Sequence, residues 1–94
     1  MLVLAVRVTI QAGHEDEVLE PLGKLQNATR QEPGCIAYFV QRSRVNLRHY
    51  LIYEQYKDQA ALDAHRASSR FKEYGTNGFY RFVEKREAEL YDPI

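Results

Sequence analysis

The sequence has few of the residues that cross-link or interrupt small proteins. Its 94 residues include one cysteine, three prolines and no tryptophan. The single cysteine, Cys35, excludes an internal disulfide and a site of paired thiolates, which agrees with a reducing compartment. No segment approaches the roughly 20 apolar residues of a membrane span, and the apolar start, residues 1–7, is too short for a signal peptide. We therefore expect a soluble, cytoplasmic protein.

Neither sign of charge is in excess, because thirteen lysines and arginines balance thirteen aspartates and glutamates. A balanced chain has no net field to attract the phosphates of nucleic acids or anionic lipids. We expect neither nucleic acid nor membrane as a partner. The sequence also contains no glycine-rich nucleotide loop, and its histidines do not stand at metal-ligand spacing. We expect no metal and no cofactor.

The chain is long enough for one domain, residues 1–94, and too short for a second. A monomer of this size buries only about 60–65% of its unfolded surface. Yet 45% of the residues are hydrophobic, including seven tyrosines and four phenylalanines. The surplus apolar surface predicts association with another chain.

Hydrophobic periodicity predicts an α+β fold. Alternation indicates a strand over residues 2–11, and a 3.6-residue period indicates a helix over 15–31, where Pro21 predicts a kink or a late start. Two strands follow at residues 35–42 and 48–57, then helical segments and a last strand near 86–91. This β-α-β-β-α-β order is ferredoxin-like: a four-stranded antiparallel sheet with helices on one face.

The other face of this sheet is predicted to be apolar and uncovered. An exposed apolar patch of this extent usually meets a partner, and a twofold copy of the same chain is the simplest one. The side chains that we expect at this homodimer interface are Val3, Ala5, Ala37, Phe39, Leu51 and Tyr53.

Three segments carry a family resemblance: residues 32–38 (EPGCIAY), 50–65 (YLIYEQYKDQAALDAH) and 65–71 (HRASSRF). Together they resemble the signature segments of the antibiotic biosynthesis monooxygenase family. The resemblance implies a dimeric α+β barrel with a pocket between each sheet and its own helices. Family members include cofactor-independent quinol and anthrone monooxygenases, haem-degrading enzymes, an isomerase of the phosphorylated autoinducer-2 signal, and proteins of no known activity. Family membership thus fixes the fold better than the reaction.

Glu54 and His65 are the candidate catalytic residues. Glu54 shares a strand face with Ile52 and Tyr56, and a carboxylate among apolar side chains is costly unless it is paired. His65 lies in the following helix, close enough to be that partner. Such a pair would orient the imidazole and raise its pKa, giving a base near neutrality. Alternatively, the pair only locks the helix to the strand.

Aromatic side chains are the candidates for a substrate pocket. Strand alternation directs Tyr38 and Tyr56 into one cavity, where a phenol offers a flat wall and a polar tip for an aromatic ligand. Phe71, Ile52 and Val6 are expected to line the same pocket. The alternative for each is core packing.

Haem is not expected. The resemblance to haem-degrading relatives implies an axial histidine in the second helical region, an asparagine on the first strand and a tryptophan on the third. The matching positions hold Gly75, Val6 and Tyr56, which all depart from that pattern.

The remaining chemistry is oxygenation of a small quinol- or anthrone-like aromatic by O₂ without a cofactor. The protein would supply deprotonation, desolvation and orientation, with His65 as base and Glu54 orienting it. One alternative is an isomerase of a small phosphorylated dihydroxyketone, for which Arg7, Arg42 or Lys57 would hold the phosphate. The other is a non-enzymatic ligand-binding dimer.

Overall fold

A four-stranded antiparallel sheet organises the whole chain, residues 1–94, in the computed structural model. The strand order is β2-β3-β1-β4, and the predicted β-α-β-β-α-β order is confirmed. The elements are β1 (Leu2–Ile10), α1 (Leu19–Thr29), β2 (Cys35–Arg42), β3 (His49–Tyr56), α2 (Gln59–Ala67), the π-helix η1 (Phe71–Thr76), the 3₁₀-helix η2 (Phe79–Phe82) and β4 (Val83–Tyr91).

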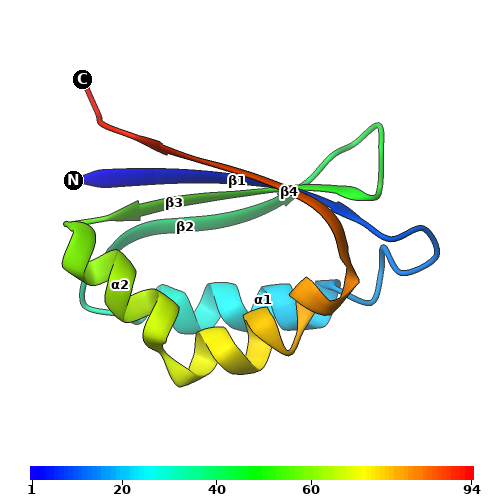
Figure 1. The fold of residues 1–94 in the computed structure, drawn as a ribbon, viewed down its shortest axis with the longest axis horizontal. Helices are drawn as coiled ribbons and strands as arrows, with labels where there is room; N and C mark the ends of the chain where they lie inside the picture. Colours follow the sequence, from blue (N-terminus) through cyan, green and yellow to red (C-terminus); the bar gives the residue numbers. More distant parts are fainter.

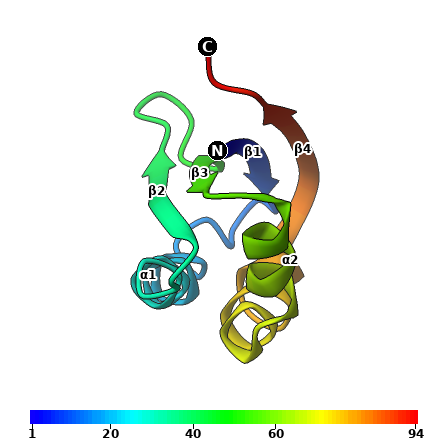
Figure 2. The ribbon, with the colours of Figure 1, turned by 90° about the vertical axis from the view of Figure 1, so that its left-hand side faces the viewer.

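All helices lie on one face of the sheet, as predicted (Figures 1 and 2). The strands bury alternate residues against them, because successive side chains of a strand point to opposite faces. On β1 these residues are Leu4, Val6, Val8 and Ile10, all at most 4% exposed. The core therefore lies entirely between this face and the helices.

Pro21 determines where α1 begins. The helix starts at Leu19, so Pro21 occupies its third position, where a backbone N–H has no partner within the helix. The first helical bond runs from the Leu22 amide to the Val18 carbonyl at 3.0 Å. The predicted helix over 15–31 is too long at its N-terminal end, and the late start is the correct alternative.

The second helical region is divided by its caps. The Asp58 carboxylate accepts from the Ala61 amide at 2.8 Å and begins α2. The Ser68 hydroxyl accepts from the Phe71 amide at 3.1 Å, where η1 begins. Gly78 lies between η1 and η2. A Cβ at that position would lie 2.2 Å from the Tyr74 carbonyl oxygen. Only glycine fits this approach.

The two outer edges of the sheet differ. At the β2 edge, side chains of α1 occupy backbone groups: the Val40 amide donates to Gln26 Oε1 at 2.8 Å, and Arg30 Nε donates to the Tyr38 carbonyl at 2.9 Å. The β4 edge has no such cover, because β4 pairs only with β1. Eight of its nine residues, 84–91, are exposed.

The sheet face away from the helices exposes some of its apolar side chains to solvent. Phe39 is 49% exposed, and Leu51 and Tyr53 are half-buried. Val3, which was predicted to be exposed, is only 8% exposed; its cross-strand neighbours are Gln55 and Tyr91. We call this surface the open face.

Candidate functional site

Glu54 and His65 lie together on the helix-covered face. Glu54 points inward from β3 and is 4% exposed, while His65 reaches the same place from α2 and is 2% exposed. His65 Nε2 stands 3.9 Å from Glu54 Oε1. The predicted proximity is confirmed, although this distance is too long for a hydrogen bond.

Tyr56 supplies the hydrogen bond of Glu54. Its hydroxyl donates to Glu54 Oε1 at 2.6 Å. Burial raises the pKa of Glu54 to about 7, against the lowering effects of this hydrogen bond and of the Arg66 and Arg86 charges. Glu54 can therefore change its protonation state near neutral pH.

Glu32 is the residue that holds the imidazole, and it was not among the predicted site residues. His65 Nδ1 lies 3.1 Å and 3.2 Å from the two carboxylate oxygens of Glu32. A carboxylate can only accept, so Nδ1 carries the proton and the neutral ring has its lone pair on Nε2. Nε2 is buried and has no hydrogen-bond partner. The site thus presents a proton-accepting nitrogen.

Burial lowers the pKa of His65, and this effect exceeds the raising effect of Glu32. The sequence-based expectation that a carboxylate partner would raise it is wrong, because desolvation of the imidazolium is the larger influence here. The imidazole is consequently neutral at physiological pH and able to accept a proton.

Three aromatic rings surround the imidazole. Their centroids lie 5.8 Å (Tyr38), 5.4 Å (Tyr56) and 5.1 Å (Phe71) from that of His65. Burial raises the pKa of both tyrosines, so their hydroxyls stay protonated. These three predicted pocket residues are thus brought together around His65.

Val6 and Ile52 lie beside each other, one alternate position along the sheet from Glu54. They are direct cross-strand neighbours on β1 and β3, and each is 1% exposed. Both belong to the continuous hydrophobic core. These positions agree with core packing, which was the alternative to a role in lining a pocket.

The site is closed in this structure. Tyr38, Glu54, Tyr56 and His65 are each at most 4% exposed. The neighbours of the imidazole that reach the surface are Glu32, whose side chain is 23% exposed, and the half-buried Phe71. The thinnest cover over the imidazole therefore lies between the turn before β2 and the start of η1.

The residues present do not fit haem. Gly75, the position at which the resemblance would place an axial histidine, has no side chain to coordinate iron, and the Phe71 ring lies 3.4 Å from where its Cβ would be. No group of three His, Cys, Asp or Glu side chains is placed to hold a metal ion.

No helix has the length and apolar character needed to span a bilayer.

Comparison with known proteins gives consistent matches. The model of the family described as antibiotic biosynthesis monooxygenase matches residues 1–76. A crystal structure of an antibiotic biosynthesis monooxygenase is 28% identical, covers all of this chain and 99% of its own, and superposes with a TM-score of 0.93. A Shewanella oneidensis protein is 29% identical, with coverage of 96% and 87% and a TM-score of 0.86.

A curated relative, an uncharacterised protein of Synechocystis, is 27% identical over 92 residues. The match covers 98% of this chain and 57% of the relative, so the chain spans little more than half the length of that protein.

Proposed function

Because the chain belongs to the antibiotic biosynthesis monooxygenase family, we propose that it oxygenates a small quinol- or anthrone-like aromatic with O₂ and without a cofactor. The observation that carries the proposal is the buried, unpartnered Nε2 of His65, whose opposite nitrogen is held by Glu32. A proton acceptor enclosed by aromatic rings suits an acidic aromatic substrate.

In this proposal, His65 Nε2 takes a proton from the substrate, and the resulting anion reduces O₂ directly. With an anthrone, the CH₂ carbon becomes a carbonyl with one oxygen atom, and its two hydrogens leave with the other oxygen atom as water. With a quinol, one oxygen atom enters as a hydroxyl and the quinol is oxidised to the quinone, which supplies the two electrons and two protons that convert the other oxygen atom to water. Glu32 fixes the imidazole through Nδ1 and stabilises the imidazolium as it forms. Glu54, 3.9 Å from the accepting nitrogen, either adds to that stabilisation or, when protonated, returns a proton to the reduced oxygen.

Tyr38 and Tyr56 are proposed to hold the substrate ring, and Phe71 to cover it. Because these groups are buried around His65, a substrate has to displace part of this cover to enter. We infer that η1 moves, since its π-helical turn carries the half-buried Phe71 and such turns are frequent at functional sites.

We also propose that the working unit is a homodimer formed through the apolar end of the open face. Phe39, Leu51 and Tyr53 are available there, and burying them would remove apolar area from water. Phe39→Glu should convert the dimer to a monomer in analytical ultracentrifugation. A monomeric parent protein would contradict this assembly.

The test is oxygen uptake by the purified protein with a panel of quinols and anthrones. His65→Ala should abolish uptake, and His65→Gln, whose amide can still meet Glu32, should abolish it without loss of folding. His14→Ala, which removes a histidine outside the site, is the matched control and should behave like the parent.

Equal uptake by the parent and His65→Gln would exclude His65 as the base. No uptake by the parent with any substrate would favour the isomerase or the ligand-binding dimer instead. These two are told apart by mass spectrometry and NMR of the recovered ligand, because an isomerase rearranges it whereas a binding protein returns it unchanged.

A further inference from the structure

Three side chains connect His65 to the surface on the helix-covered side of β4. The centroid of the Phe71 ring lies 5.1 Å from that of His65 and 6.2 Å from that of Tyr80 on η2. Arg86 on β4 donates from Nε to the Tyr80 hydroxyl at 3.2 Å, and its guanidinium lies 5.9 Å from the centre of the Tyr80 ring. We propose that Arg86 and Tyr80 bind an acidic group of the substrate, so that the site takes a carboxylated aromatic. This inference rests on the proposed function and narrows its substrate class.

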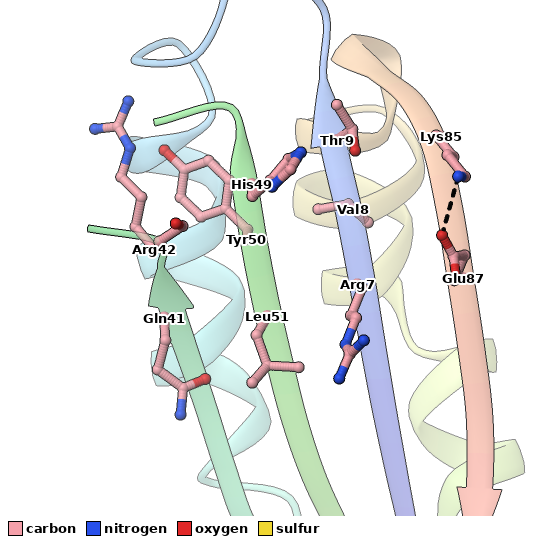
Figure 3. Close-up of a pocket in the computed structure, with 11 residues that line it drawn as sticks. Arg7, Val8, Thr9, Gln41, Arg42, His49, Tyr50, Leu51, Lys85 and Glu87 are labelled. Carbon is pink, nitrogen blue, oxygen red and sulfur yellow. Dashed lines mark ion pairs between the residues drawn. The ribbon is translucent and has the colours of Figure 1, made fainter. Parts of the chain in front are cut away.

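Arg86 lies on the helix-covered side of the sheet, although its neighbours on β4 lie on the open face. Its cross-strand partner on β1 is Val8, which is 3% exposed and belongs to the core, and residues directly opposite each other on neighbouring strands share a face. Lys85 and Glu87, on either side of Arg86, pair with each other at 3.2 Å on the open face (Figure 3). Arg86 is therefore outside the surface proposed for the homodimer.

Arg86 is also a cation without a carboxylate partner. No Asp or Glu oxygen lies within 4.0 Å of its guanidinium, whereas Arg48 and Arg70 each pair with a carboxylate. Burial raises the pKa of Glu54, and the charges of Arg66 and Arg86 act against this effect, so both charges reach the site. The Arg86 Nε is occupied by Tyr80, but its two terminal nitrogens remain for an anion, to which a guanidinium makes paired, charge-assisted hydrogen bonds.

Tyr80 links this cation to the interior. It is half-buried, and after burial and Glu54 it is the next group that raises the pKa of Tyr38. Because Arg86 donates to the Tyr80 hydroxyl, the hydrogen of that hydroxyl is available to an acceptor. An anion at this position would thus find a charged donor and a neutral donor together.

The charges around the imidazole explain why such a cation is needed. The titratable groups that approach His65 most closely are the carboxyl groups of Glu32 and Glu54. A substrate that loses a proton here becomes more negative beside them, which is unfavourable unless a cation offsets the charge. Arg7, which was considered as a phosphate anchor for an isomerase, lies on the open face (Figure 3). Arg86 can act on the covered side, where Arg7 cannot.

The experiment is an NMR titration of the full chain with naphthoate, which has no hydroxyl group to oxidise, and with its uncharged methyl ester. The parent should bind the acid more tightly than the ester, with shifts in the signals of Phe71, Tyr80 and Arg86. Arg86→Gln should weaken binding of the acid about tenfold, the effect of losing one charged hydrogen bond, and should leave binding of the ester unchanged.

Arg70→Gln is the matched control. Arg70 also donates to a tyrosine hydroxyl at 3.2 Å, that of Tyr74, and its guanidinium lies 5.9 Å from the centre of that ring. Because Tyr74 is not in contact with His65, Arg70→Gln should bind naphthoate like the parent. The inference is overturned if the parent does not prefer the acid to the ester, or if Arg86→Gln and Arg70→Gln bind the acid equally well.

Oxygen uptake separates this inference from the proposed function. Gentisate, a carboxylated quinol, and methyl gentisate are offered to the parent and to Arg86→Gln, which should raise KM for the acid about tenfold and leave the ester unaffected. Uptake with no preference for the acid would keep the oxygenase and overturn the anion site. Binding of naphthoate that depends on Arg86, without uptake of oxygen from any quinol, would keep the anion site and exclude the oxygenase.

Discussion

Tyr38 and Phe39 are neighbours on β2, yet they face two different environments. Tyr38 points to the helices and is 2% exposed, next to His65; Phe39 points to the open face and is 49% exposed. The same contrast runs through β3, where Glu54 is buried and Tyr53 is only half-buried. The covered face thus concentrates desolvated titratable groups, whereas the open face keeps its charges in water. Each face suits a different chemistry.

The largest expected effect compares these two neighbours directly. Tyr38→Ala should lower the free energy of unfolding by about 3–5 kcal/mol, as for other buried aromatic truncations. Phe39→Ala should cost about 1 kcal/mol or less in the monomer, since half of its surface is already in water. Urea unfolding at a fixed low protein concentration measures both. Equal losses would show that the open face is buried under those conditions.

The next effect concerns pH. The pKa of Glu54 rises from 4.5 unfolded to about 7 folded, so the folded state binds the extra proton, and stability falls as pH rises from 4.5 through 7. Glu54→Gln removes this penalty and should be more stable than the parent by up to about 3 kcal/mol above pH 7.

The pH comparison has an internal check. His65 contributes with the opposite sign, because its pKa is lowered on folding and its stability contribution is lost as pH falls below 6.5. That contribution is common to the parent and Glu54→Gln. Glu87→Gln, which removes a carboxylate from the open face, controls for net charge. A stability difference between Glu54→Gln and the parent that did not change with pH would show that Glu54 is not buried as an acid.

A smaller effect is expected at Glu32. Glu32→Gln should reduce oxygen uptake by roughly tenfold or more, since one hydrogen bond to a charged group contributes about 1.5–3 kcal/mol. Losing the carboxylate should lower the pKa of His65 further, so the acidic limb of the pH–rate profile should move to lower pH. Imidazole ¹⁵N chemical shifts should report the loss of the fixed Nδ1–H tautomer. An unchanged tautomer would remove the positioning role.

The smallest effect should come from the open face. Arg7→Leu should change the free energy of unfolding by no more than about 0.5 kcal/mol, because the Arg7 side chain is exposed and has no ion-pair partner within 4.0 Å. Thermal unfolding is sufficient to measure this. If Arg7→Leu lowered the free energy of unfolding by several kcal/mol, Arg7 would have a structural role. The open face would then not differ from the covered face in its contribution to stability.

Local signals in the sequence were sufficient for much of the fold. Strand alternation placed Glu54 inward and Phe39 outward, and Pro21 marked the late start of α1. Each of these depends on residues within a few positions of one another, and local rules therefore describe them.

The site was less predictable because its key contact is not local. Glu32 and His65 are 33 residues apart, and their meeting depends on how the turn after α1 passes the end of α2. The strand-face pattern pointed to Glu54 as the partner, since Glu54 interrupts an apolar face, whereas Glu32 stands in a turn where acidic residues are common. The sequence also does not indicate that the surrounding side chains bury the His65 imidazole almost completely.

The unequal edges of the sheet also limit how copies of the chain could aggregate. Side chains from α1 occupy two backbone groups of the β2 edge, whereas no side chain of a helix bonds to the outer edge of β4. Two copies that joined β4 to β4 about a twofold axis would use both free edges at once. A third copy could add only at the β2 edge, where it would have to displace Gln26 and Arg30 from the Val40 amide and the Tyr38 carbonyl, so strand addition beyond the first step is disfavoured.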